Sequence, residues 1–281
     1  MMEYIYYLME SALPFEFIKY DFMKNALIAI LLITPLFAMV GTMVVNSKLA
    51  FFSDALGHSA LTGIALGSIF GLENPLASMV GFAIVFALLL SYIKDKDKSS
   101  EDTLISVFSS AAIALGLVIL SGNGNFSKYS SYLVGDILSV SEGDILFLLI
   151  AFLCVNIIWH FIYNNLLIVS INPSMARSKN INVKLTENIF LVLVAVIVTV
   201  SIKWVGILVI NSLLIIPCAA AKNLAKSMRS YQNISIAIGM FSGVFGLILS
   251  YYMNAAAGPV VVLISAFSFF VSVLYKSIKR I

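Results

Sequence analysis

The chain alternates between long apolar runs and short polar segments along nearly its whole length. A helix that crosses the hydrocarbon core of a bilayer needs about 20 apolar residues. Nine runs approach or exceed that length, and they span residues 25–45, 53–71, 75–93, 103–121, 144–168, 187–202, 205–221, 233–253 and 257–275. The pattern predicts an all-α, polytopic integral membrane protein with about eight or nine transmembrane helices.

Two stretches decide between eight helices and nine. The run 53–71 is weakly apolar because it contains Asp54 and His58 together with several hydroxyl side chains. The stretch 187–221 predicts either two crossings that turn at Lys203–Trp204 or one long, broken helix.

The composition excludes a soluble globular domain. Hydrophobic residues make up 61% of the chain and charged residues only 11%, whereas soluble domains average about 45–50% and about 25%. We expect a single transmembrane domain over residues 25–281. Residues 1–24 mix aromatic side chains with charged ones, which predicts an amphipathic segment at the membrane interface.

The basic residues gather in short segments between the apolar runs. These segments are residues 94–98, 172–184, 222–229 and 276–280. Cytoplasmic loops are enriched in lysine and arginine, so we expect all four on the cytoplasmic side and the loop 121–132 outside. The net charge of +3 therefore indicates orientation in the bilayer and not a nucleic-acid partner. We expect no cleavable signal peptide, and no disulfide between Cys154 and Cys218, which lie far apart in separate apolar runs.

Asp54 and His58 are the main candidates for chemistry. Their spacing of four residues places both on one face of a helix. Ionisable groups inside a membrane segment are costly and usually mark a pathway. A carboxylate oxygen and an imidazole nitrogen together suit Zn²⁺ or Mn²⁺. Two ligands make an incomplete site, which suits an ion in passage, and a symmetric dimer would supply two such pairs.

The same pair has other interpretations. Asp54 and His58 could lock two helices together, or Asp54 could cap a helix near the interface. They could also relay protons in an ion-coupled secondary transporter.

Three further polar residues lie in or near apolar runs. Asp136 either lines an outer vestibule or serves as a loop or cap residue, and the second interpretation is favoured. His160 near the end of its run suggests an interface residue, and Asn211 suggests a hydrogen bond between helices.

Small residues and a proline predict local packing. Gly63 and Gly67 lie one turn apart and indicate a close contact between helices. Pro217 should kink its helix and leave a carbonyl that could line a cavity. Cys218 is best explained as a small buried hydrophobic residue rather than a metal ligand.

Several enzyme classes lack support. The sequence contains no G-x-x-x-x-G-K-[ST] loop for ATP and no H-E-x-x-H zinc motif. It also shows no G-x-S-x-G motif of a hydrolase. If ATP drives this protein, the ATPase must be another chain.

Five stretches resemble, in order and spacing, the zinc/manganese/iron permease family of bacterial ABC importers. They are Lys48–Gly67, which contains Ser-Asp-Ala-Leu-Gly-His, then Tyr132–Asp144, Asn172–Val183, Lys203–Ala221 and Ala257–Leu263. The resemblance covers nearly the whole chain from about Asn25. The sequence departs from the usual family pattern at Ser53, where glycine is common, at Gly57, where serine or alanine is common, and at Cys218, where alanine is common.

The resemblance implies a homodimeric permease in the bacterial cytoplasmic membrane, with two ATP-binding subunits inside and a metal-binding protein outside. It implies that Asp54 and His58 pass the metal. It also implies that Asn172–Val183 contacts the ATPase, and the residues agree with this role. Pro173 after Asn172 can start a short helix, and Met175, Ala176 and Ile181 offer an apolar face beside Arg177.

We therefore expect an importer subunit for a divalent transition metal, with zinc favoured over manganese and iron third, and with no permanently bound cofactor. Alternating access would carry the ion past Asp54 and His58. Because a histidine must be neutral to bind metal, we expect transport to fail at acid pH. The alternatives are the secondary transporter, a permease for a bulky metal chelate, and an intramembrane enzyme.

Overall fold

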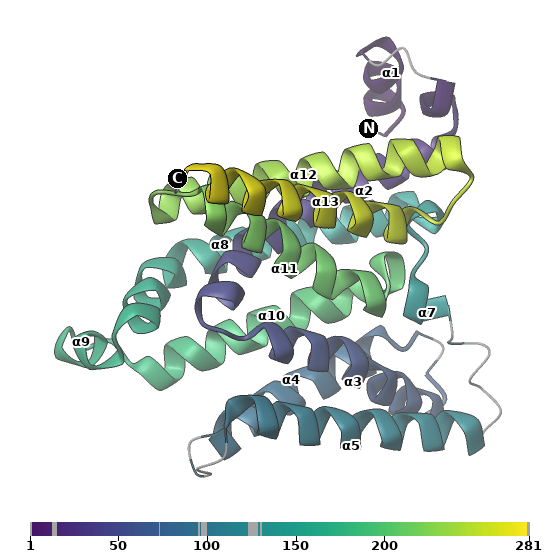
Figure 1. The fold of residues 1–281 in the computed structure, drawn as a ribbon. Coiled ribbons are helices and arrows are strands. Elements are labelled where there is room, and N and C mark those ends of the chain that lie inside the picture. Colours follow the sequence, from purple (N-terminus) through teal and green to yellow (C-terminus); the bar gives the residue numbers. More distant parts are fainter. Residues whose placement is uncertain are drawn as a thin grey trace. The chain divides into compact units, whose positions relative to one another are not determined.

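The structure is a computed structural model of the full chain and describes residues 2–12, 16–72, 74–94, 96, 100–122, 129 and 131–279. Within these ranges, every regular element is helical (Figure 1). The N-terminal elements are α1 (Met2–Ala12) and η1 (Glu16–Lys19). The remaining elements are α2 (Asp21–Asn46), α3 (Ala50–Ile69), α4 (Leu76–Lys94), α5 (Glu101–Gly122), α7 (Ser131–Val134), η2 (Ile137–Ser139), α8 (Glu142–Ile171), α9 (Pro173–Ser178), α10 (Val183–Val205), α11 (Ile207–Leu224), α12 (Met228–Met253) and α13 (Ala257–Lys279).

Each of the nine apolar runs forms one helix, so the all-α fold is confirmed. Seven helices in the described ranges are long and apolar enough to span a membrane, namely α2, α4, α5, α8, α10, α12 and α13. A shorter apolar segment, Ser212–Leu224, belongs to α11. The remaining run forms α3, which carries Asp54 and His58.

The stretch 187–221 forms two helices, but the predicted turn at Lys203–Trp204 is wrong. The break lies at Gly206, where φ is 84° and ψ is 150°. This backbone conformation is essentially restricted to glycine. Lys203 and Trp204 therefore remain in the last turn of α10. Gly206 separates the two helices because glycine tolerates this backbone conformation.

The chain forms two compact units, and it passes between them four times, within α2, α7, α8 and α10. Unit 1 consists of Met1–Thr42, Val134–Asn156 and Lys203–Ile281, and unit 2 consists of Met43–Leu133 and Ile157–Ile202. The predicted boundary between residues 24 and 25 does not coincide with a helix end, because α2 begins at Asp21. The proposal of one transmembrane domain preceded by an interfacial segment stays a prediction.

In unit 2, α3 packs closely against α4 and α5 (Figure 1). A Cβ atom at Gly63 would lie only 2.6 Å from the Cα atom of Met79 on α4. On α5, a Cβ at Gly116 would lie 2.8 Å from the backbone nitrogen of Thr62. The Thr62 hydroxyl also donates a hydrogen bond to the carbonyl of Ala112. These short approaches fix α3 between its neighbours, and Gly67 meets Ser78 of α4 in the same way.

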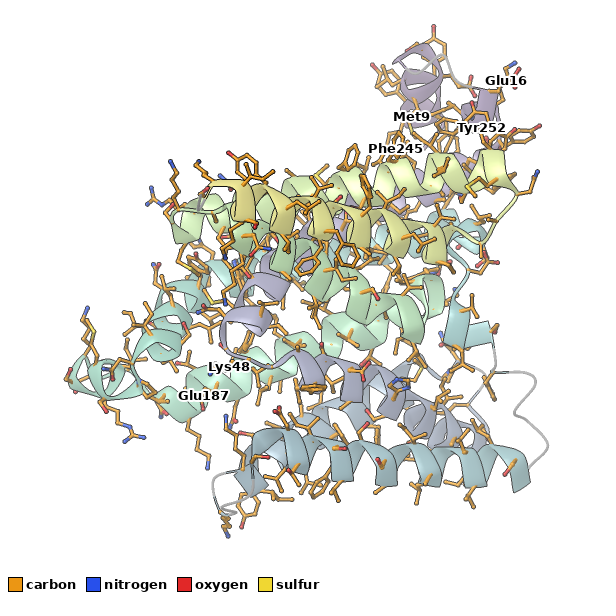
Figure 2. The ribbon with its side chains drawn as sticks, viewed as in Figure 1. Met9, Glu16, Lys48, Glu187, Phe245 and Tyr252 are labelled. Carbon is orange, nitrogen blue, oxygen red and sulfur yellow. The ribbon has the colours of Figure 1, made fainter. Side chains whose placement is uncertain are left out.

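In unit 1, the N-terminal segment is attached to the start of α2. Lys24 is only 3% exposed, and its Nζ atom lies 2.5 Å from Glu10 and 2.9 Å from Asp21. Phe17 and Ile18 of η1 are buried in an apolar cluster with residues of α2, α12 and α13. Figure 2 labels Glu16 and Met9 of this segment near Tyr252, close to the end of α12.

Candidate metal site

Asp54 and His58 lie in the first half of α3, on one face of the helix. The chain turns at Lys48, where φ is 60°, and α3 begins at Ala50. Gly57 lies between the two side chains without breaking the helix. The spacing of four residues in an unbroken helix therefore places both side chains on the same face of α3.

The pair has a separation that suits shared metal ligation. His58 Nε2 lies 3.7 Å from Asp54 Oδ1, which is too long for a hydrogen bond. Two ligands on one tetrahedral ion, each with a bond of about 2.0–2.1 Å, would lie about 3.3 Å apart. The side chains are 31% exposed for His58 and 46% for Asp54. A small closing movement of either side chain would bring both within reach of one cation.

The site is incomplete within one copy of the chain. Among the described residues, no group of three or more histidine, cysteine, aspartate or glutamate side chains could hold a metal ion. Asp54 and His58 supply two ligands, whereas a tightly held structural zinc usually has four. Water or a second copy of the chain could supply further ligands.

Asp136 caps a short helix in unit 1. Its Oδ1 atom accepts a hydrogen bond from the backbone nitrogen of Leu138 at 3.1 Å, at the start of η2. This is the cap role favoured from the sequence. Asp136 also lines a cavity of about 90 Å³ together with Gly135, Trp204 and Gly258. Its predicted role in an outer vestibule stays a prediction.

The wall of this cavity contains features that the sequence interpretation did not single out. Trp204 is 3% exposed, and its Nε1 atom has no hydrogen-bond partner among the residues described. Gly135, with φ of 72°, lies against the backbone of the break at Gly206. A Cβ at Gly135 would lie 2.6 Å from the carbonyl oxygen of Val205. Gly135 and Gly206 each lie in a stretch that resembles the permease family, Tyr132–Asp144 and Lys203–Ala221. Nothing in the sequence indicated that these two glycines contact each other.

Pro217 lies inside α11, as expected, and has no N–H group to donate to the carbonyl of Leu213. Leu213 lines the same cavity. Cys218 is buried, donates to the carbonyl of Ala38 at 3.4 Å and accepts from the hydroxyl of Ser235 at 2.9 Å. These contacts fit the predicted structural thiol. Asn211 lies in α11, and His160 lies exposed on α8.

The segment after α8 forms the expected short helix. The Oδ1 atom of Asn172 accepts from the backbone nitrogens of Ser174 at 2.9 Å and Met175 at 3.2 Å, and Pro173 is the first helical residue. At the other end, Asn180 adopts φ of 57°. The chain therefore has a strong local start and stop for α9.

The predicted apolar face of this segment needs one correction. Met175 is 47% exposed, whereas Ala176 is fully buried. Adjacent residues on a helix point about 100° apart, so the two side chains cannot share one face. The predicted contact of Ala176 with the ATPase stays a prediction. The carbonyl of Ala176 accepts the N–H of Ile181 at 3.0 Å, which closes the helix end. Arg177 is exposed beside Met175.

The resemblance implies that α9 contacts an ATPase subunit, so we expect the Asn172→Ala change to weaken retention of that subunit, because the helix loses a cap worth about 1 kcal/mol. That loss corresponds to roughly fivefold weaker association if α9 must be ordered to bind. The measurement is the amount of ATPase that co-purifies with the permease. Asn172→Asp is the matched control, since aspartate caps equally well. Equal retention by both variants would contradict the role assigned to the cap.

Comparisons with known proteins identify the family. The family model described as ABC 3 transport family matches residues 19–276. The chain belongs to this family. The sequence-based family assignment is confirmed, and so is the expectation that the chain is a membrane subunit of an ABC transporter rather than an enzyme.

Some relatives of this chain are named for zinc uptake and others for manganese import. The chain is 34% identical to the high-affinity zinc uptake system membrane protein ZnuB of Haemophilus influenzae, over 92% of this chain and 98% of that protein. It is 29% identical to the manganese import system permease protein ScaB of Streptococcus gordonii, over 94% and 98%.

A solved structure supports the ABC 3 fold directly. PsaBC from Streptococcus pneumoniae in complex with Fab contains a chain that superposes with a TM-score of 0.80 at 28% identity, covering 90% of this chain and 91% of that one. The helices of this protein therefore have the arrangement of an ABC importer permease.

Proposed function

We propose that this chain forms the translocation pathway of an ATP-driven importer of divalent transition-metal ions, with zinc as the first substrate to test, manganese second and iron third. The observation that carries the proposal is the Asp54–His58 pair, 3.7 Å apart on one partly exposed face of α3. Relatives named for zinc and for manganese uptake support the substrate class. The higher identity to the zinc protein is the reason to test zinc first.

The proposed assembly is a homodimer in the bacterial cytoplasmic membrane. Two permease copies would each contribute one Asp54 and one His58, which gives four ligands for one ion. A metal-binding protein would deliver the ion from outside. Two ATPase subunits would contact α9 on the inside, where Arg177 and Met175 are exposed.

In the proposed cycle, the ligand set must hold the ion only briefly. Two carboxylates and two neutral imidazoles suit Zn²⁺ and Mn²⁺. Because each protomer supplies only half of the set, a small change in the spacing of the two copies would dismantle the site and release the ion. Closure of the ATPases would drive that change through α9.

The decisive experiment is uptake into proteoliposomes that contain the permease, its ATPase and the binding protein. We expect accumulation of ⁶⁵Zn that requires ATP and the ATPase and that persists when a protonophore collapses the proton gradient. Competition with unlabelled manganese and iron ranks the metals. Uptake that proceeds without the ATPase and follows the proton gradient would instead establish the secondary transporter, for which Asp54 and His58 would relay protons.

A further inference from the structure

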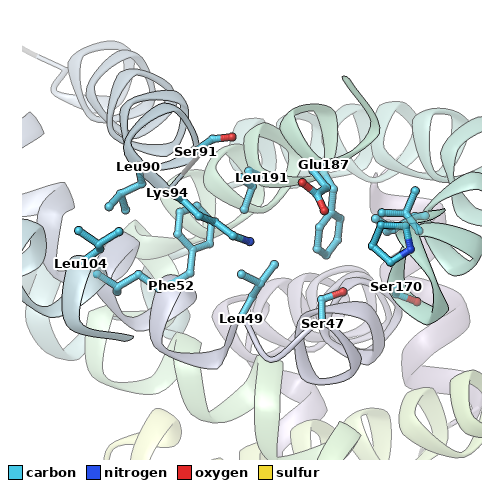
Figure 3. A pocket seen from close by; sticks show the side chains of 15 residues that line it. Ser47, Leu49, Phe52, Leu90, Ser91, Lys94, Leu104, Ser170, Glu187 and Leu191 are labelled. Atoms are coloured by element: carbon cyan, nitrogen blue, oxygen red, sulfur yellow. The ribbon is translucent and has the colours of Figure 1, made fainter. Parts of the chain in front are cut away.

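A pocket in unit 2 lies among the ends of several helices and has a volume of about 200 Å³ (Figure 3). For comparison, an engineered apolar cavity of about 150 Å³ binds benzene. The pocket can therefore take a short stretch of hydrocarbon chain. Its lining residues come from the turn between α2 and α3 and from the start of α3. The others come from α4, α5, α8, α9 and α10.

Much of the pocket lining is apolar and buried. This part is formed by the buried side chains of Phe52, Leu90, Leu104, Ile105, Leu166, Val169, Phe190 and Leu191. Water gains few hydrogen bonds in such surroundings, so a hydrocarbon ligand is favoured over solvent.

The polar residues of the pocket lie near helix ends. Ser47 follows α2, Ser91 lies in the last turn of α4, and Lys94 is the last residue of α4. Ser170 lies in the last turn of α8, and Glu187 lies about one turn into α10. The helices α4, α8 and α10 are long and apolar enough to span a membrane, and we expect the ends of such helices near the lipid headgroups. Figure 3 shows Leu90 and Leu104 at one end of the pocket, and Glu187 and Ser170 toward the other end.

The charges that line the pocket have both signs. Figure 3 shows the side chains of Lys94 and Glu187 directed into the pocket. Lys48 lies in the turn between Ser47 and Leu49, which both line it. Lys94 and Glu187 also have interactions within the protein, and a bound headgroup would add to these. An ammonium can approach the carboxylate, and a phosphate can approach the lysine, as charge-assisted hydrogen bonds require.

We propose that this pocket binds an aminophospholipid of the phosphatidylethanolamine type. The phosphate accepts from the Lys94 ammonium, the headgroup ammonium donates to the Glu187 carboxylate, and part of one acyl chain contacts the apolar lining. The remainder of the lipid stays in the bilayer. Because the site includes Pro173, the lipid would lie beside α9. The proposal does not depend on which metal the protein carries.

Native mass spectrometry of the purified full-length chain tests the proposal. The chain is delipidated and then exposed to equal amounts of phosphatidylethanolamine, phosphatidylglycerol and phosphatidylcholine. Phosphatidylglycerol lacks the ammonium, and the quaternary ammonium of phosphatidylcholine has no N–H donor. We expect retention of phosphatidylethanolamine about tenfold above the other two, which is the effect expected from losing one charge-assisted hydrogen bond.

Variants locate the site on the protein. Lys94→Met and Glu187→Gln should each reduce retained phosphatidylethanolamine about tenfold. Lys96→Met is the matched control, because Lys96 lies two residues from Lys94, contacts Tyr92 and does not line the pocket. Size-exclusion chromatography confirms that each variant is folded. Equal retention of the three lipids by the unmodified chain, or unchanged retention by Lys94→Met, would overturn the proposal.

Discussion

Replacing His58 with alanine is expected to reduce ATP-driven zinc uptake about 100-fold or more. Loss of a group that only supports a metal ligand typically costs 10–100-fold in metal affinity or activity, and His58 is itself the proposed ligand. The imidazole lies 3.7 Å from the Asp54 carboxylate on the same face of α3. Removing it leaves one ligand per protomer, too few to compete with water for the ion.

The chain offers a matched control for this prediction. His160 is the other of its two histidines and lies exposed on α8. We expect His160→Ala to transport zinc normally. Asp54→Asn should fail like His58→Ala, since it keeps the side-chain shape and removes the anionic ligand. ATPase co-purification must remain normal in each variant, so that a folding defect is not mistaken for loss of the site. Normal uptake by the Asp54→Ala, His58→Ala double variant would refute the proposed metal pathway.

Replacing Gly206 with alanine is expected to destabilise the protein by about 3 kcal/mol or more. The residue has φ of 84° and ψ of 150°, a conformation that costs other residues about 1–3 kcal/mol. The added Cβ would also overlap the backbone of Val134 and Gly135. Overpacking of this kind typically adds about 1–3 kcal/mol. Since the atoms it meets belong to the backbone, no rotamer change can relieve the overlap.

Thermal unfolding in detergent measures this effect. At about 2–4 °C per kcal/mol, the apparent Tm should fall by on the order of 10 °C. Gly81→Ala is the control, because Gly81 lies inside α4 and an added Cβ there would meet nothing within 4 Å. Alanine favours a helix over glycine by up to about 1 kcal/mol, so this variant should be unchanged or slightly stabilised. A similar Tm for Gly206→Ala and Gly81→Ala would show that the contact at the helix break contributes little.

Features that depend on local sequence could be predicted. Nine apolar runs became nine helices because an apolar segment that pairs its own backbone groups in a helix leaves none of them unsatisfied away from water. The shared face of Asp54 and His58 follows from their spacing. The start of α9 follows from the capping residue Asn172 and from Pro173, which favours the first helical position.

Features that depend on distant contacts could not be predicted. The break at Gly206 is fixed partly by Gly135, which lies 71 residues earlier in the sequence. Lys94 and Glu187 meet in one pocket although each looks like an ordinary loop or helix-end charge. The burial of Ala176 depends on which side of a six-residue helix faces the protein, and so short a helix has no clear periodicity.

The weak hydropathy of α3 has a consequence for membrane insertion during synthesis. Although α3 has 20 residues, it is absent from the helices that qualify as spans by composition. Asp54 is the fifth of these 20 residues and His58 the ninth, and both ionisable side chains make insertion of a lone α3 less favourable. The close approaches of Gly63 to Met79 and of Thr62 to Gly116 provide the missing stabilisation only when α4 and α5 are present. We therefore expect α3 to leave the translocon together with its successors, so that a nascent chain truncated before α4 would fail to integrate this segment.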